Sequence, residues 1–138
     1  MSNLVRMSVS LDRDLADRFD REIERTGCPT RSKAVADLIR QSLVRQEWAD
    51  GDEVSGAVIM VYDHHTRGLG GRLTRIQHDA VHLILATQHF HLDHDNCLEI
   101  LAVKGPPRDI ARLHEKLAAV KGLKHCSLAA ATTGRELP

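Results

Sequence analysis

The sequence predicts an α+β protein in two parts: a strand followed by two helices, and then elements in the order βαββαβ. Apolar residues alternate at the N-terminus, two helical stripes follow, and a polar, turn-forming segment at 50–53 separates them from further strand-length apolar runs. We therefore predict one domain over residues 1–49, a hinge over 50–55 and a second domain over 56–138.

Composition narrows the class of protein. The chain has 138 residues, enough for one ordinary domain or two very small ones. It has no apolar run of membrane-spanning length and no signal-peptide pattern, which predicts an unexported, cytoplasmic protein without a membrane partner. Three widely spaced cysteines cannot form a disulfide framework, so we expect free thiols.

The charges are balanced. The formal net charge is zero, so the strongly basic signature of many nucleic-acid-binding domains is missing. Any argument for DNA binding must rest on where the charges are placed.

The first part begins with a strand over 4–11. Its apolar side carries Val5, Met7, Val9 and Leu11, and its polar side carries Arg6, Ser8 and Ser10. Asp12 is suited to cap a first helix, which Gly27 and Pro29 end. Thr30 is suited to cap a second helix, whose apolar stripe runs to about Trp48.

Such a strand and two helices cannot complete a sheet alone, so we predict an obligate twofold dimer whose strands pair antiparallel. The paired strands would present Arg6, Ser8 and Ser10 twice, on a ribbon that fits the DNA major groove. The amides near Thr30, Arg31, Ser32 and Lys33 suit a phosphate. The alternative is an edge strand whose polar side faces solvent. The segments LDRDL and TRSKAVADLIR resemble the ribbon-helix-helix family of DNA-binding repressors over about residues 4–47.

The second part is predicted to be a ferredoxin-like split βαβ domain, with both helices on one face of a four-stranded sheet. The predicted strands are 57–62, 82–91, 97–103 and 123–130, and the predicted helices are 69–81 and 110–120.

The stretch 78–97 concentrates metal-binding residues, with five of the nine histidines and one cysteine. On a strand, His89 and His91 lie on one face, and a hairpin loop at 92–96 would return Cys97 to the same edge. Two imidazoles and a thiolate suit copper, zinc, iron or nickel. A fourth ligand is needed, with His78 as the leading candidate and His64, His82 and His94 behind it. His65, His114 and His125 have no partner set and are expected to be surface residues.

The whole arrangement resembles the nickel-responsive regulator family, NikR, through Gln77-His78, His89-Phe90-His91 and the run from His94 to Ile100. The resemblance implies one Ni(II) per subunit, bound square-planar by His89, His91 and Cys97, with His78 from a neighbouring subunit. It also implies an ACT-like metal domain, a homotetramer formed as a dimer of dimers, and no nucleotide cofactor. The partner would be a palindromic double-stranded operator, with Arg6, Ser8 and Ser10 reading the bases.

One position departs from the family. A second cation site is associated with an acidic pair early in the second helix, where Asp37 matches but Lys33 stands in place of Glu. An ammonium cannot ligate a cation, so this site is expected to be altered, and Lys33 to contact phosphate. The residues expected to support the ligands or a secondary metal are His64, His94, Glu99 and Asp37.

Other functions compete with a nickel-dependent repressor. A ribbon-helix-helix antitoxin would carry an extended tail, whereas 56–130 has the pattern of a folded domain. A copper, zinc or cobalt sensor would use the same donor types, and a sensor of a small molecule would use the same fold. A metalloenzyme would need an open coordination position with a nearby acid or base such as Glu99. No lid or pocket pattern accompanies that residue, and we predict a protein that is not an enzyme.

Overall fold

The computed structural model describes residues 3–138, so Met1 and Ser2, the start of the predicted first domain, lie outside the described residues. Residues cluster into two compact units, 1–41 and 42–138, which divide within a helix. The division of domains by a hinge at 50–55 stays a prediction.

The first unit contains α1, Arg13–Thr26, and the start of α2, Arg31–Asp50. The Asp12 carboxylate accepts hydrogen bonds from the amides of Asp14 and Leu15, at 3.0 and 3.4 Å. Gly27 ends α1 in the left-handed region, at φ 68°. The Thr30 hydroxyl accepts a hydrogen bond of 3.0 Å from the Lys33 amide. The predicted helices and their caps are confirmed.

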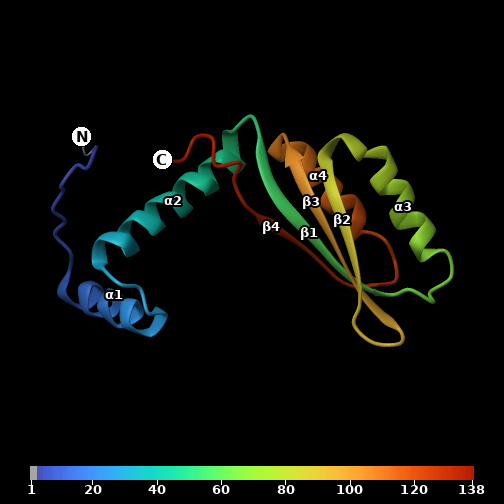
Figure 1. Ribbon diagram of the computed structural model, residues 1–138, viewed down its shortest axis with the longest axis horizontal. Coiled ribbons are helices and arrows are strands. Elements are labelled where there is room, and N and C mark those ends of the chain that lie inside the picture. Colours follow the sequence, from blue (N-terminus) through green and yellow to red (C-terminus); the bar gives the residue numbers. More distant parts are fainter. Residues whose placement is uncertain (1–2) are drawn as a thin grey trace. The chain divides into compact units, whose positions relative to one another are not determined.

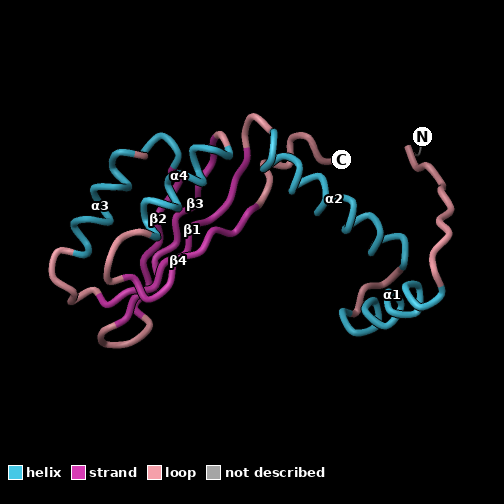
Figure 2. The backbone as a smooth tube through the Cα atoms, turned by 180° about the vertical axis from the view of Figure 1, so that it is seen from behind, coloured by secondary structure: helices cyan, strands magenta, loops and turns pink. Residues whose placement is uncertain are grey.

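Residues 3–12 precede α1 as a chain without strand pairing, drawn as loop in Figure 2. Val5, Met7 and Val9 are 86%, 74% and 62% exposed. Within the described part of α1 and α2, no side chain is buried. A strand forms only beside another strand, so the ribbon predicted at 4–11 requires a second copy and stays a prediction.

The second unit is an α+β domain that confirms the predicted βαββαβ order. Its sheet has the order β2-β3-β1-β4, with every neighbouring pair antiparallel, and α3 and α4 lie on the same side of it (Figure 1). The elements are β1 Val54–Asp63, α3 Leu69–Asp79, β2 Ile84–His91, β3 Asn96–Gly105, α4 Pro107–Ala118 and β4 Leu123–Ala130.

The core lies between the sheet and these two helices. Alternate residues of β1 and β3 are buried, among them Met60 and Leu101, while α3 and α4 contribute Leu73 and Leu117. This period of two is that of strands with one covered face. Strand β2 lies at the sheet edge, and its residues from Leu85 to His91 are exposed.

The predicted start of the second strand of this domain is wrong. Val81–Leu83 form a short 3-10 helix, η1, and β2 begins only at Ile84 rather than at His82. The Leu83 amide donates to the Ala80 carbonyl at 2.9 Å, and the Leu83 side chain is 4% exposed. Burial of Leu83 against the core therefore favours a turn where the sequence pattern indicated a strand.

The last turn of α2 is fastened to the sheet. The Trp48 indole N–H donates to the Ala131 carbonyl at 2.8 Å, and the Ala131 amide donates to the Ser55 carbonyl at 2.9 Å. A Cβ on Gly56 would lie 3.3 Å from the Trp48 ring and 2.6 Å from the Ala129 carbonyl oxygen. Only glycine fits between them without displacing backbone.

Candidate metal centre

His89, His91 and Cys97 lie on one face of the β2–β3 hairpin. His91 is in register with Cys97, and His89 is in register with Glu99. Residues opposite each other in an antiparallel pair share a face, and here it is the face that carries the core residues of β3. The two imidazole centroids lie 5.5 Å apart. Strand alternation thus places two nitrogen donors and one sulfur donor on one face of the hairpin. In the described residues they do not form a group of three donors within 4.8 Å of one another, and their role as ligands stays a prediction.

The Cys97 side chain is fully buried. Its exposed fraction is 0%, and its Sγ donates to the Tyr62 carbonyl at 3.3 Å. Burial raises the pKa of the Cys97 thiol, so the protonated form is favoured at neutral pH. A metal that takes sulfur as a ligand here must displace this proton.

Glu99 is a buried carboxylate, 7% exposed, with both oxygens bonded. The Tyr62 hydroxyl donates to Oε2 at 2.7 Å, and the Gln77 amide donates to Oε1 at 3.2 Å. The Tyr62 ring also meets the His89 ring edge-on, at 6.1 Å between centroids. Burial, followed by the hydrogen bond to Glu99, raises the pKa of Tyr62, so its phenol stays a donor. Glu99 therefore connects α3 and β1 to the strand that carries Cys97, while its role in supporting metal ligands stays a prediction.

The fourth candidate ligand, His78, lies in the last turn of α3 and is exposed. In the described part of the chain, three donor atoms lie within 4.8 Å of one another in two groups, Asp63–His64–His65 and His65–His94–Asp95. Neither group contains His78, His89, His91 or Cys97. His82, another candidate, lies in η1 and is exposed. The single chain therefore does not assemble the predicted four-ligand set.

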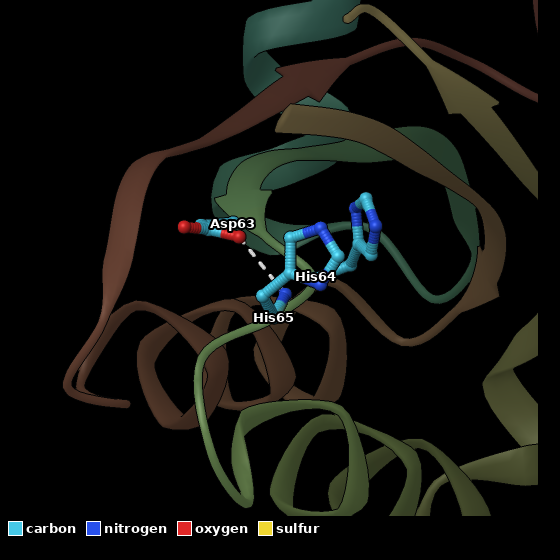
Figure 3. A group of neighbouring side chains, drawn as sticks. All are labelled: Asp63, His64 and His65. Carbon is cyan, nitrogen blue, oxygen red and sulfur yellow. Dashed lines mark hydrogen bonds between the residues drawn. The ribbon is translucent and has the colours of Figure 1, made fainter. Parts of the chain in front are cut away.

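The two donor groups form a histidine cluster at the end of β1, defined here as Asp63, His64, His65, His94 and Asp95. Figure 3 shows three of these residues, Asp63, His64 and His65. The Asp63 carboxylate accepts from the His65 amide at 2.9 Å, and the Asp95 carbonyl accepts from the His64 amide at 3.2 Å. The expectation that His65 has no partner set is wrong. The signal is topological: β1 and β3 pair Asp63 with Asn96, which places the two loops at one end of the sheet.

His114 also differs from expectation. Its side chain is half-buried on α4, and its Nε2 is buried with no hydrogen-bond partner among the described residues. His125 is exposed as predicted, and its Nε2 lies 3.1 Å from the Ser127 hydroxyl.

The residues predicted to contact DNA lie in the first unit. Arg6, Ser8 and Ser10 are exposed in the segment before α1, and Ser32 is exposed in the first turn of α2. Arg31 donates through Nε and Nη2 to the Asp20 carboxylate, at 2.8 and 2.5 Å. This hydrogen-bonded pair lowers the pKa of Asp20. Arg31 therefore has a partner in the chain that a phosphate would have to replace.

Lys33 is paired in the same way. Its ammonium lies 2.5 Å from the Asp37 carboxylate, which also accepts from Arg40 at 3.3 Å. The hydrogen bond from Lys33 lowers the pKa of Asp37. The Asp37 carboxylate is thus paired with two cationic side chains, Lys33 and Arg40, while the altered second-cation site stays a prediction.

Known proteins match both parts of the chain. The family model for the NikR C terminal nickel binding domain matches residues 55–131, and that for ribbon-helix-helix proteins of the copG family matches residues 5–46. Among full-length relatives named as nickel-responsive regulators, one from Syntrophus aciditrophicus is 50% identical over 135 residues, covering 98% of each chain. Another, from Chlorobium phaeobacteroides, is 52% identical over 128 residues, covering 93% of this chain and 96% of its own.

A solved structure has a similar fold over part of the chain. The uncharacterized protein TM1266 from Thermotoga maritima aligns with a TM-score of 0.52 at 14% identity, covering 56% of this chain and 96% of its own. At this identity the likeness concerns the fold alone. No helix in the described part of the chain has the length and apolarity to cross a membrane.

The matched models define the class of protein: a ribbon-helix-helix transcription regulator, rather than an enzyme, that carries a ferredoxin-like metal-binding domain. Within that class, the chain belongs to the NikR family.

Proposed function

We propose that the protein is a nickel-responsive transcriptional repressor of the cytoplasm, which binds a palindromic operator when loaded with one Ni(II) per subunit. The observation that carries the proposal is the placement of His89, His91 and Cys97 on one sheet face, in a chain that also has a ribbon-helix-helix segment. Relatives named as nickel-responsive regulators at about half identity over nearly the whole chain support it.

The donor set fits nickel. Imidazole and thiolate are suitable ligands for Ni(II), and a square-planar site needs four donors. His89, His91 and Cys97 would hold the ion, which supplies a link between subunits if His78 of a second copy completes the site. The position of His78 supports this assignment, because the residue is exposed on α3 and therefore accessible to a second copy of the chain.

Dependence of DNA binding on nickel follows from this shared site. A ligand shifts an equilibrium only by its differential affinity for two states. If the ligand set is complete only in a tetramer, nickel favours the arrangement of subunits that forms it. A dimer of dimers would present two ribbons to two half-sites of one operator. Repression of nickel-uptake genes at high nickel would be the result.

A test combines spectroscopy with operator binding. The nickel-loaded protein should show thiolate-to-nickel absorption and the mass of a tetramer, and it should bind the operator tightly. His89→Ala should lose the nickel dependence of operator binding, whereas His125→Ala, which alters an exposed histidine on another strand, should keep it. The proposal fails if His89→Ala binds the operator as tightly with nickel as the parent protein does.

Base recognition by the ribbon is a separate prediction. Arg6→Ala should weaken operator binding by about 1–3 kcal/mol and relax the base preference, because arginine can bridge guanine O6 and N7. Titration of operators with single base changes measures both effects. Unchanged discrimination in this variant would show that Arg6 does not read bases.

A further inference from the structure

We propose that the cavity between α3, η1 and α4 binds a small zwitterion with an apolar side chain, which is the chemistry of a free apolar amino acid such as leucine. The cavity lies within the second unit and has a volume of about 320 Å³. Ligand-binding cavities begin at about 300 Å³, so this volume suits a small molecule. The inference goes beyond the proposed function, because it assigns a second ligand whose binding does not require nickel.

The floor of the cavity is apolar. It is formed by residues from the end of α3, from η1 and from α4, namely Ile76, Ala80, Leu83 and Leu113. Leu83 and Leu113 are buried in the core, and Ile76 and Ala80 are half-buried against it. An aliphatic side chain that enters this floor displaces water from apolar surface on both sides, which favours binding.

The mouth of the cavity is charged, with opposite signs on its two walls. Arg112 and Lys116 lie four residues apart on α4 and therefore share one face of that helix. Asp79, the last residue of α3, lines the opposite wall. All three side chains are exposed. A ligand carboxylate can thus meet the α4 wall while a ligand ammonium meets Asp79.

The protein's own ion pairs do not bridge the two walls. Among the described residues, Arg112 pairs with Asp109 of the same helix, at 3.8 Å, and neither Asp79 nor Lys116 has an ion-pair partner. The Arg112 side chain is 61% exposed, and an exposed pair at this distance is weak, so a ligand carboxylate can compete for it. His82 completes the polar lining, with an exposed imidazole that can donate or accept a hydrogen bond.

The arrangement of charges selects a zwitterion over a simple ion. An anion would meet the α4 wall but would also approach the Asp79 carboxylate, and a cation would meet Asp79 but approach Arg112 and Lys116. Like charges placed together disfavour binding, so a molecule that carries both signs is complementary to both walls. The apolar floor beneath a charged mouth adds an aliphatic side chain to this requirement, which gives an apolar amino acid.

The experiment is a titration of the metal-free, full-length protein with L-leucine, followed by proton–nitrogen correlation NMR. The backbone amide signals of Ala80, Leu83 and Leu113 should shift and saturate, whereas that of Ala129 on β4, outside the lining, should stay in place. Isocaproate lacks the ammonium of leucine, and isoamylamine lacks its carboxylate. Each should bind about tenfold more weakly than leucine, because each loses one charge-assisted contact.

Paired variants assign each charge to its wall. Asp79→Asn should weaken leucine binding about tenfold without weakening that of isocaproate, which has no ammonium to lose. Lys116→Gln should weaken both leucine and isocaproate without weakening isoamylamine. Lys121→Gln, which changes an exposed lysine outside the lining, is the matched control and should bind all three as the parent does. Retained binding of one probe by each variant shows that its cavity is folded.

The possible outcomes separate this site from the metal centre. Absence of saturable shifts at the cavity would overturn the proposal, as would equal affinities for leucine and its two analogues. Leucine binding that Asp79→Asn and Lys116→Gln both leave unchanged would overturn it as well. None of these results bears on the nickel-dependent function, because no metal is present in the titration.

Discussion

Among single residues, Glu99 has the strongest structural role near the metal centre. It is a buried carboxylate whose two oxygens accept from Tyr62 on β1 and Gln77 on α3. A buried carboxylate is tolerated when hydrogen bonds from the protein replace those from water. Removing one of these donors therefore lowers the stability of the fold. Gln77 directly precedes His78, so the same carboxylate holds the end of α3 that carries the candidate fourth ligand.

Tyr62→Phe should lower the free energy of unfolding by about 1–3 kcal/mol, because it leaves the Glu99 carboxylate with a missing donor. Urea unfolding measures the change. In a Glu99→Gln background the same substitution should cost less, since a neutral amide is cheaper to leave without a partner. Equal costs in both backgrounds would contradict a Glu99 carboxylate that depends on Tyr62 as a hydrogen-bond donor.

The position of a single residue can be predicted from the sequence where the local strand or helix periodicity determines it. His89 and His91 share a face because strand residues alternate, and the hairpin returns Cys97 beside them. The partners of His65 depend instead on which strand lies next to β1, a long-range fact absent from the local pattern. The burial of His114 Nε2 likewise depends on packing between elements.

At the scale of elements, the β2–β3 hairpin is ordered by its loop as well as by its strands. The Asp93 carboxylate accepts from the amides of Asp95 and Asn96, at 2.9 and 2.7 Å, and from the Asn96 side chain. Such a turn fixes the register by which His91 meets Cys97. The hydrogen bonds from the Asn96 side chain and then the backbone lower the pKa of Asp93 to about 2.

Asp93→Ala should speed amide hydrogen exchange at Asp95 and Asn96 about tenfold, because each amide loses a hydrogen bond in the folded state. Asp93→Asn, which retains an acceptor oxygen, is the matched control. In the parent protein the lowered pKa means that the ionised Asp93 stabilises the hairpin fully above the ordinary value of 3.8, and that this contribution is lost as pH falls through about 2. The measurement is made on the metal-free protein. Equal exchange rates at Asp95 and Asn96 in Asp93→Ala and Asp93→Asn would contradict a turn held by the Asp93 carboxylate.

Caps and breakers allow most elements to be predicted. Asp12, Gly27 and Thr30 each perform the expected role, because their effect depends on adjacent residues. The 3-10 turn at Val81–Leu83 could not be predicted from alternation, because burial of Leu83 in a distant core determines it.

At the scale of the whole molecule, the two units differ in how much they bury. The second has a closed core, whereas α1 and the described part of α2 contain no buried side chain. Leu15, Leu38 and Ile39 are about half exposed, at 54%, 52% and 48%. A polypeptide of this size needs an apolar interior, so the exposed stripe predicts a second copy of the chain.

Met7→Asp should abolish operator binding and loosen pairing of the N-terminal segments, because it places a charge on the apolar side of the predicted ribbon. Met7→Leu preserves that side and should behave as the parent. Operator binding together with protease sensitivity of residues 3–12 measures the effect. Tight operator binding by Met7→Asp would contradict a ribbon whose apolar side packs between copies.

The bond between Trp48 and Ala131 has a mechanical consequence. Together with the hydrogen bond from the Ala131 amide to the Ser55 carbonyl, it holds the last turn of α2 against the β1–β4 side of the sheet. A rotation of this side of the sheet is therefore transmitted to the base of α2 instead of being absorbed by the three residues between α2 and β1.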